Sequence, residues 1–158
     1  MKLVWLFGVA AAAMLAGLMW MLAPLDPGVL TLQFAFTPQA FANVIHAWSP
    51  EPLALYRAHL PFDFILLGCY GAFGYLLVAR STLFVSWRPA ARTAVRWILP
   101  AAAAFDAAEN VLHVWLTAVP RFGVTLPYFA AALCSLLKWA LLCGFALAVV
   151  RALAQTRR

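Results

Sequence analysis

The chain has 158 residues, enough for one domain, and 66% of them are hydrophobic while only 10% are charged. Soluble proteins average roughly 45–50% apolar and about 25% charged residues, so this composition excludes an ordinary soluble domain and indicates an integral membrane protein. The net charge of +6 does not indicate nucleic-acid binding, because the basic residues form no continuous patch and lie mostly at the ends of apolar segments.

An uncharged run at residues 3–25, preceded by Lys2, predicts the first membrane span, since about 20 apolar residues cross the hydrocarbon core as a helix. A secretory signal peptide is the alternative, because Lys2 gives a short basic start and the alanines at residues 10–13 resemble a cleavage site. The apolar stretch is longer than the roughly 7–15 residues of a signal-peptide core. We therefore favour a retained anchor.

The longest predicted non-spanning segment, residues 26–59, contains an amphipathic helix that either lies on the membrane surface or caps the bundle. Thr37 followed by Pro38 is a helix-start signal. Apolar residues then recur at i, i+3, i+4 and i+7, namely Phe41, Val44, Ile45 and Trp48. A second helix start at Ser49 is expected to lead into the next span, with a bend at Pro61.

The second predicted span, residues 60–79, combines polar side chains with a thin face. Asp63 and Tyr70 lie two helical turns apart on one face, so the carboxylate and the phenol are both expected to point into the bundle. A packing aromatic with a satisfied hydroxyl is the alternative reading of Tyr70. The thin face comes from small residues that favour close helix contact, namely Gly68, Gly71, Ala72 and Gly74.

The third and fourth spans are predicted at residues 97–120 and 126–150, and the basic residues set the orientation. Eight basic residues fall on one side: Lys2, Arg80, Arg88, Arg92, Arg96, Arg151, Arg157 and Arg158. Two fall on the other side, Arg57 and Arg121. By the positive-inside rule, we expect an antiparallel four-transmembrane-helix bundle in a bacterial inner membrane. The whole chain, residues 1–158, forms this one domain, with both termini cytoplasmic and residues 26–59 external.

The third span carries four polar residues on one helical face, because Asp106, Glu109, Asn110 and His113 follow one another at i, i+3, i+4 and i+7. An ionised side chain at mid-bilayer costs about 2.5–3.5 kcal/mol on insertion scales. Lys138, near the middle of the fourth span, is the one cation at comparable depth. A buried ion pair between Lys138 and Glu109, or between Lys138 and Asp106, is therefore expected.

Three carboxyls in predicted spans outnumber this cation, so at least one should be protonated or hydrogen-bonded, with Asn110 and His113 as the expected donors. Such a centre suits proton transfer. The candidate catalytic residues are Asp106, Glu109 and His113. The candidate ligand-binding residues are Asp63, Tyr70, Asn110, Lys138 and Trp139. In the structural alternative, the same groups only hold the helices together through hydrogen bonds.

Other chemistry has weaker signals in this sequence. The acids and histidine of the third span are the ligand types of iron or manganese bundles, but those bundles carry Glu-x-x-His pairs on two helices, whereas His46 and His59 lie in the predicted external segment. No metal and no cofactor are expected. Ser135 and Cys134 lie one turn from Lys138 without a second signal for nucleophilic catalysis. The three cysteines form no CxxC pair and are expected to pack as small apolar residues.

Two short motifs, DAAEN at residues 106–110 and SLLKW at residues 135–139, resemble those of a family of small four-span bacterial membrane proteins. The external stretch LQFAFTPQAFANVIHAW, residues 32–48, is similar as well. The resemblance implies the four-span plan and brings no known activity. In general architecture the chain is also similar to the EXPERA-type sterol-isomerase and lipid-binding bundles.

Three functions follow as hypotheses. In the first, the polar centre lines a cavity, roofed by the helix at residues 41–48, that binds a lipophilic small molecule or lipid, with acid/base, isomerase-like catalysis as one version. In the second, the chain is a non-enzymatic accessory or assembly subunit of a larger membrane complex, and its partners are other membrane proteins. In the third it is a proton-coupled transporter, which would need a homo-oligomer because four spans lack an inverted repeat.

Overall fold

The computed structural model describes residues 1–156, and within them the chain forms six helices and no strand. The helices are α1 (Lys2–Leu22), α2 (Val29–Gln33), α3 (Pro38–Ala47), α4 (Pro50–Arg80), α5 (Pro89–Ala118) and α6 (Leu126–Thr156). Three of them, α1, α4 and α6, are long and apolar enough to cross a membrane. The predicted all-helical class and the prediction of a membrane protein agree with this finding.

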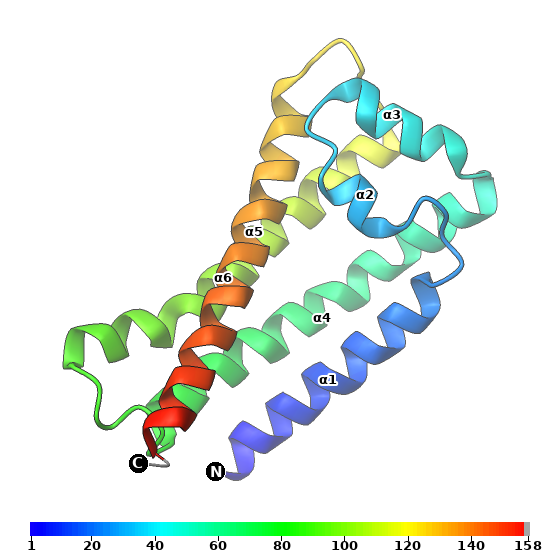
Figure 1. Cartoon of the computed structure of the whole chain (residues 1–158). Coiled ribbons are helices and arrows are strands. Elements are labelled where there is room, and N and C mark those ends of the chain that lie inside the picture. The colour runs from blue at the N-terminus through cyan, green and yellow to red at the C-terminus, as the bar shows by residue number, and fades with distance from the viewer. Residues whose placement is uncertain (157–158) are drawn as a thin grey trace.

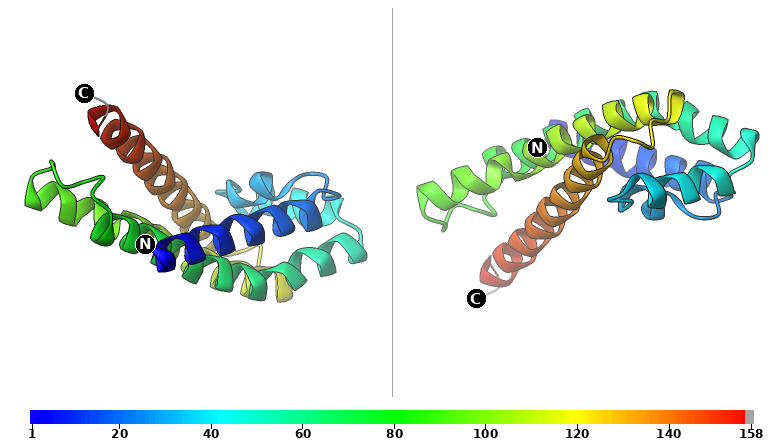
Figure 2. Two further views of the ribbon diagram at one scale, coloured as in Figure 1. Left: turned by 90° about the horizontal axis from the view of Figure 1, so that it is seen from below. Right: turned by 90° about the horizontal axis from the view of Figure 1, so that it is seen from above.

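The four long helices run alternately in opposite directions, and the two chain ends lie at the same end of the molecule (Figure 1). In space their order is α1, α4, α5, α6, because α4 packs against α1 and α5, and α5 packs against α4 and α6. The two outer helices, α1 and α6, diverge from each other (Figure 2). The long helices thus form a curved layer that stays open between α1 and α6.

Helix α4 begins at Pro50, where the sequence predicted a helix start, and runs without a break through the predicted span at residues 60–79. Pro50 at the first helical position and Glu51 in the first turn both favour helix initiation here. Pro61 lies inside α4 without ending it. Residues of the predicted external segment therefore extend the face that carries Asp63.

Helix α5 begins at Pro89, eight residues before the predicted third span, and the connection after α4 shrinks to residues 81–88. The reason lies partly in Arg92, whose guanidinium donates to the Val78 carbonyl at 3.2 Å. Carbonyls at a helix C-terminus lack partners within the helix, so this contact ties the start of α5 to the end of α4.

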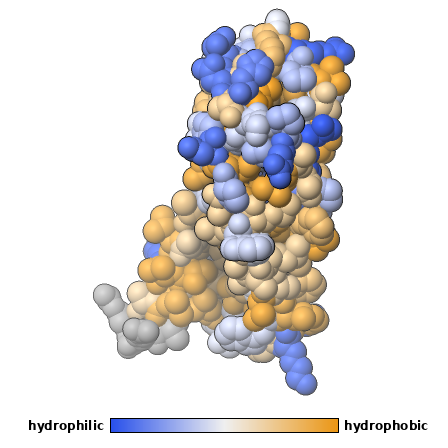
Figure 3. All heavy atoms as spheres, turned by 90° about the vertical axis from the view of Figure 1, so that its right-hand side faces the viewer, coloured by the Kyte–Doolittle hydropathy of each residue, from blue (hydrophilic) through white to orange (hydrophobic). Residues whose placement is uncertain are grey.

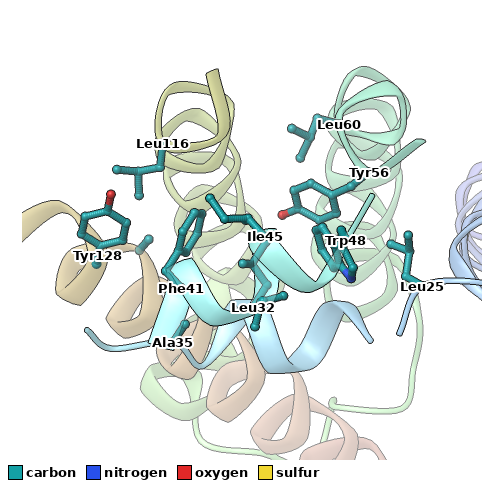
Figure 4. Close-up of a cluster of buried hydrophobic side chains, with 12 residues drawn as sticks. Leu25, Leu32, Ala35, Phe41, Ile45, Trp48, Tyr56, Leu60, Leu116 and Tyr128 are labelled. Atoms are coloured by element: carbon teal, nitrogen blue, oxygen red, sulfur yellow. The ribbon is translucent and has the colours of Figure 1, made fainter. Parts of the chain in front are cut away.

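The segment that contains α2 and α3 caps the layer of long helices, which is one of the two placements that the sequence predicted for its amphipathic helix. The Thr37 side chain caps α3 by accepting from the Ala40 amide at 3.1 Å, as the sequence signal predicted. All four apolar residues of the predicted helical face are buried in a cluster that joins α3 to α4, α5 and α6. Figure 4 shows Phe41 and Ile45 pointing from α3 toward Leu116 and Tyr56. Sequence analysis missed α2, which lies before α3.

The surface divides into a polar end and an apolar body. In Figure 3, hydrophilic residues gather at the capped end, and apolar residues cover most of the surface below it. On α1, large side chains are left exposed, including Trp5 at 68%, Met19 at 67% and Trp20 at 83%. An exposed apolar surface of this extent is typical of a face that contacts lipid or another membrane helix.

The thin face of α4 explains how closely α5 approaches. A Cβ atom added at Gly74 would lie 2.6 Å from the Cβ of Leu99, and one added at Gly71 would lie 3.4 Å from the Cβ of Ala103. A Cβ added at Gly68 would meet nothing within 4 Å. Two of the three glycines thus let the helices pack closely, and the third faces open space.

We expect Gly74→Ala to destabilise the protein by about 1–3 kcal/mol, because the new methyl overlaps the Leu99 side chain close to the backbone of α5. Gly68→Ala is the matched control and should be neutral or stabilising by up to about 1 kcal/mol, since alanine favours helix. Thermal unfolding of both variants in the same detergent measures the difference. Equal melting temperatures would contradict the close α4 to α5 contact.

Candidate functional site

The predicted polar face of α5 is buried because α5 lies between α4 and α6. Asp106, Glu109, Asn110 and His113 are all buried, and so is Lys138 on α6. Glu109 has no exposed surface at all. The structure therefore brings these five predicted site residues together in one enclosed centre, which we call the polar centre.

Lys138 holds the polar centre together by contacting two carboxylates at once. Its Nζ atom lies 2.9 Å from Asp106 Oδ1 and 2.8 Å from Glu109 Oε2. The sequence predicted one of these ion pairs, and the structure contains both. The Lys138 ammonium also lies 5.6 Å from the centroid of the Trp139 ring, while the Trp139 indole donates to Gln33 Oε1 at 3.1 Å. Trp139 thus links the centre to α2.

Two hydrogen bonds from the other side tie α4 to the same face of α5. The Tyr70 hydroxyl donates to Asp106 Oδ2 at 3.1 Å, and the Asn110 amide donates to Asp63 Oδ2 at 2.6 Å. Both oxygens of Asp106 are therefore occupied, one by a phenol and one by an ammonium. The centre joins three helices through side chains that would be costly to leave unpaired in lipid.

At the capped end the centre extends to His113 and to a tyrosine that the sequence analysis missed. The Tyr56 hydroxyl and His113 Nδ1 are hydrogen-bonded at 2.7 Å, and the Phe41 ring packs on the imidazole with centroids 5.8 Å apart. Tyr56, Asp63 and Tyr70 follow one another at intervals of seven residues on α4. This spacing was the available signal, but the predicted span began at residue 60 and left Tyr56 outside it.

Glu109 has fewer partners than its burial demands. Its Oε1 atom lies 3.9 Å from His113 Nδ1 and makes no hydrogen bond. The Ser135 hydroxyl neighbours Glu109 but donates to the Ala131 carbonyl at 3.1 Å. Since a hydroxyl can rotate toward either acceptor, Ser135 is the one nearby donor that can turn to this carboxyl without moving a helix.

The polar centre is closed at Glu109 and His113 but reaches the surface on α4 and α6. Asp63 and Tyr70 are partly exposed, and Trp139 is 38% exposed. Within the described part of the chain, Asp63 Oδ1 accepts no hydrogen bond, since only Oδ2 meets Asn110. The accessible groups are therefore a free carboxylate oxygen and a phenol, which we call the Asp63/Tyr70 edge.

The predicted cavity over Glu109 does not match the hollows of this structure. One hollow of about 650 Å³ is lined by α4 and one α5 residue: Ala54, Arg57, Ala58, Leu60, Pro61, Phe64 and Val114. A second, of about 460 Å³, lies at the opposite end of α4. No residue of the polar centre lines either of these two hollows.

The length of the polar centre along α5 bears on the hypothesis of a proton-coupled transporter. Its side chains run along α5 from Asp106 to Thr117, whose hydroxyl donates to the His113 carbonyl at 2.6 Å. Eleven residues of helix cover about 16 Å, at 1.5 Å each. The hydrocarbon core of a membrane is about 30 Å thick, so this track of polar groups does not cross it within one chain.

Among residues 1–156, no group of three or more histidine, cysteine, aspartate or glutamate side chains is arranged to hold a metal ion. Cys134 of α6 lies near Glu109 and Lys138 but is only partly buried, whereas Ser135 is fully buried.

No protein-family model, curated protein or solved structure matches the chain. The interpretation of the centre therefore rests on its own geometry.

We expect Lys138→Met to lower the free energy of unfolding by about 3–5 kcal/mol, because it leaves Asp106 and Glu109 buried without their cation. The triple variant Lys138→Met, Asp106→Asn, Glu109→Gln should recover most of this loss, since no buried charge is then unpaired. Lys2→Met, at the exposed start of α1, is the control. Unfolding in mixed micelles measures the stability of all three variants. A Lys138→Met variant as stable as the unchanged protein would contradict the stabilising role of the Lys138 ion pairs.

Proposed function

We propose that this chain is a four-span protein of a bacterial inner membrane that binds a lipophilic molecule bearing an amine or a hydroxyl at the Asp63/Tyr70 edge. The observation that carries the proposal is a partly exposed carboxylate with one free oxygen, set in an apolar surface and backed by a buried ion centre. The site has two requirements, a fourth span and a ligand of suitable charge.

The fourth span is α5, although its polar face makes it less apolar than the three candidate spans. It is 30 residues long, or about 45 Å of helix, which exceeds the hydrocarbon core of a membrane. It packs lengthwise between two helices that are apolar enough to cross. Its two acids contact Lys138 and its Asn110 amide contacts Asp63, so in this part of the helix it presents apolar side chains such as Val111 and Val114 outward.

This topology predicts that both chain ends lie in the cytoplasm. Green fluorescent protein fused after α6 should fluoresce, whereas alkaline phosphatase inserted in the loop at residues 119–125 should be active outside. If α5 did not cross, that loop would lie on the same side as residues 81–88. The phosphatase would then be inactive, and the C-terminal fluorescent protein would be dark.

The charge of the edge selects the ligand. Lys138 is already shared by Asp106 and Glu109, so the carboxylate of Asp63 has no cation of its own in the described part of the chain. An amine, or a hydroxyl that donates, compensates a carboxylate in an apolar setting, whereas a fatty acid would add a like charge. The Tyr70 hydroxyl, already fixed by Asp106, can also accept a hydrogen bond from the ligand.

The geometry favours binding over acid/base catalysis. A general acid or base must reach the substrate, either directly or through one water. Glu109 and His113 are enclosed, and both oxygens of Asp106 are occupied. Isomerase-like chemistry at these residues would require the centre to open, whereas binding at Asp63 requires no rearrangement of the ion pair.

The ligand is tested with two photoactivatable, clickable probes, an analogue of sphingosine and an analogue of palmitic acid. The sphingosine probe carries an amine and hydroxyls, so it should label the purified protein and the palmitate probe should not. Asp63→Asn should reduce this labelling by about tenfold or more, because hydrogen bonds to charged groups contribute roughly 1.5–3 kcal/mol. Tyr70→Phe should have a smaller effect.

Glu51→Gln is the control for this experiment, because Glu51 is an exposed acid at the start of the same helix. Its labelling should equal that of the unchanged protein. Equal labelling of Asp63→Asn, or equal labelling by the two probes, would contradict the proposed site.

An accessory or assembly subunit is the second candidate, and α1 is the observation that favours it. This helix packs chiefly on α4 and forms one edge of the layer, so its other face leaves Trp5 and Trp20 exposed. In such a subunit the polar centre only fixes the layer. A stable monomer in mild detergent would count against this candidate, and retention of a defined membrane partner that Trp20→Ala releases would support it.

A further inference from the structure

A basic hollow lies at the end of the molecule opposite the cap, where the connection between α4 and α5 meets the last turns of α6. Its volume is about 460 Å³. Its lining comes from three segments of the chain and consists of Ser86, Trp87, Arg88, Ala91, Arg151 and Gln155. Four of these six residues have polar or cationic side chains.

The hollow has a wall that internal contacts hold in place. The Trp87 indole donates to Gln155 Oε1 at 2.9 Å, which ties the connection to α6. The Trp87 ring also packs edge-on against Phe84, with centroids 5.3 Å apart, and Phe84 is fully buried. The shape of the hollow is therefore fixed without a ligand.

The two arginines of the hollow have no carboxylate to neutralise them. Arg151 lies over the Trp87 ring, with its guanidinium carbon 5.6 Å from the centroid, and Arg88 forms no ion pair within the described residues. The sequence has no acidic residue between Asp63 and Asp106, and none after Glu109. No acidic side chain of the described residues therefore neutralises these two arginines.

Neighbouring arginines are engaged differently. Arg92 donates to carbonyls at the end of α4, and Arg96 lies over the Tyr75 ring with its guanidinium carbon 5.6 Å from the centroid. These two have structural partners outside the hollow. Arg88 and Arg151 are thus distinguished by their position in the lining of the hollow.

We infer that this hollow binds the phosphate group of an anionic phospholipid, with the Arg88 and Arg151 guanidiniums donating to its oxygens. Arginine is suited to this role because its planar fork makes paired hydrogen bonds to phosphate. The hollow adjoins exposed apolar residues of α6, such as Val150 beside Arg151, and a tryptophan wall is common at the boundary between lipid and water. Basic pockets at the cytoplasmic side of membrane helices recognise such headgroups.

A soluble phosphate ester shares this chemistry, and the location favours lipid. The acyl chains of a lipid bound here would run along the exposed apolar residues of α6 near the hollow, Leu147 and Val150. A soluble ester would gain nothing from that surface. Competition between the two sources therefore belongs in the test.

The test uses the full-length protein in mild detergent and counts lipid adducts by native mass spectrometry. The lipids are phosphatidylglycerol and, as the neutral comparison, phosphatidylcholine. The unchanged protein should retain phosphatidylglycerol preferentially. Arg88→Gln with Arg151→Gln should reduce its affinity roughly 10- to 30-fold, from the usual contribution of a basic residue near an anionic membrane.

Arg121→Gln is a matched control, because Arg121 also lies over a tryptophan ring, 5.8 Å from the Trp115 centroid, but at the capped end. Its adducts should equal those of the unchanged protein. If the double variant does not fold, Arg88→Gln alone decides, because Arg88 is exposed and supports no core contact. The lysine pair Arg88→Lys, Arg151→Lys should lose less than the glutamine pair, since it keeps the charge.

Two results would overturn the inference. The first is unchanged phosphatidylglycerol binding by the glutamine variants. The second is displacement of the lipid by millimolar inorganic phosphate, which would assign the hollow to soluble phosphate.

Discussion

One ammonium group, that of Lys138, makes the rest of this arrangement feasible. Helix α5 carries two acids, an amide and an imidazole on one face, and each ionised group would cost about 2.5–3.5 kcal/mol in the centre of a membrane. Lys138 contacts both acids from α6, while Tyr70 and Asn110 complete the hydrogen bonds on the α4 side. The same contacts fix the order of three helices. Helix α5, with its polar face, is thereby enclosed between α4 and α6, which are both apolar enough to cross a membrane.

The centre is asymmetric because α3 closes it at one end only. The Phe41 ring packs on His113, and the Trp48 ring packs on Tyr56 with centroids 5.1 Å apart, so α3 seals the capped end (Figure 4). Asp63 and Tyr70 stay partly exposed, although Tyr70 packs against the cluster of buried residues that joins α1 to α4. The accessible carboxylate of the centre is therefore the one on α4.

Features that depend on residue spacing and charge could be predicted from the sequence. Features that depend on packing between distant segments of the chain could not. The Lys138 ion pair was predictable, because only one cation lies at the depth of Asp106 and Glu109. The start of α4 was predictable from Ser49 and Pro50, whereas the start of α5 was misplaced, because hydropathy marks the apolar core of a helix while Pro89 marks where it begins. Nothing in the sequence specified that α1 and α6 would stay apart.

The two proposed binding sites, the Asp63/Tyr70 edge and the hollow lined by Arg88, differ in charge and lie far apart along α4. Asp63 and Arg80 are 17 residues apart, or about 25 Å of helix, and the hollow lined by Arg88 lies beyond the end of α4. All five acids of the chain lie in the capped half or at the polar centre, while the opposite end carries arginines without acids. The proposed cationic or hydroxyl-bearing ligand would thus be drawn to the Asp63/Tyr70 edge, and the proposed anionic headgroup to the far end. Both ligands could be bound together, because neither proposed site uses a residue of the other.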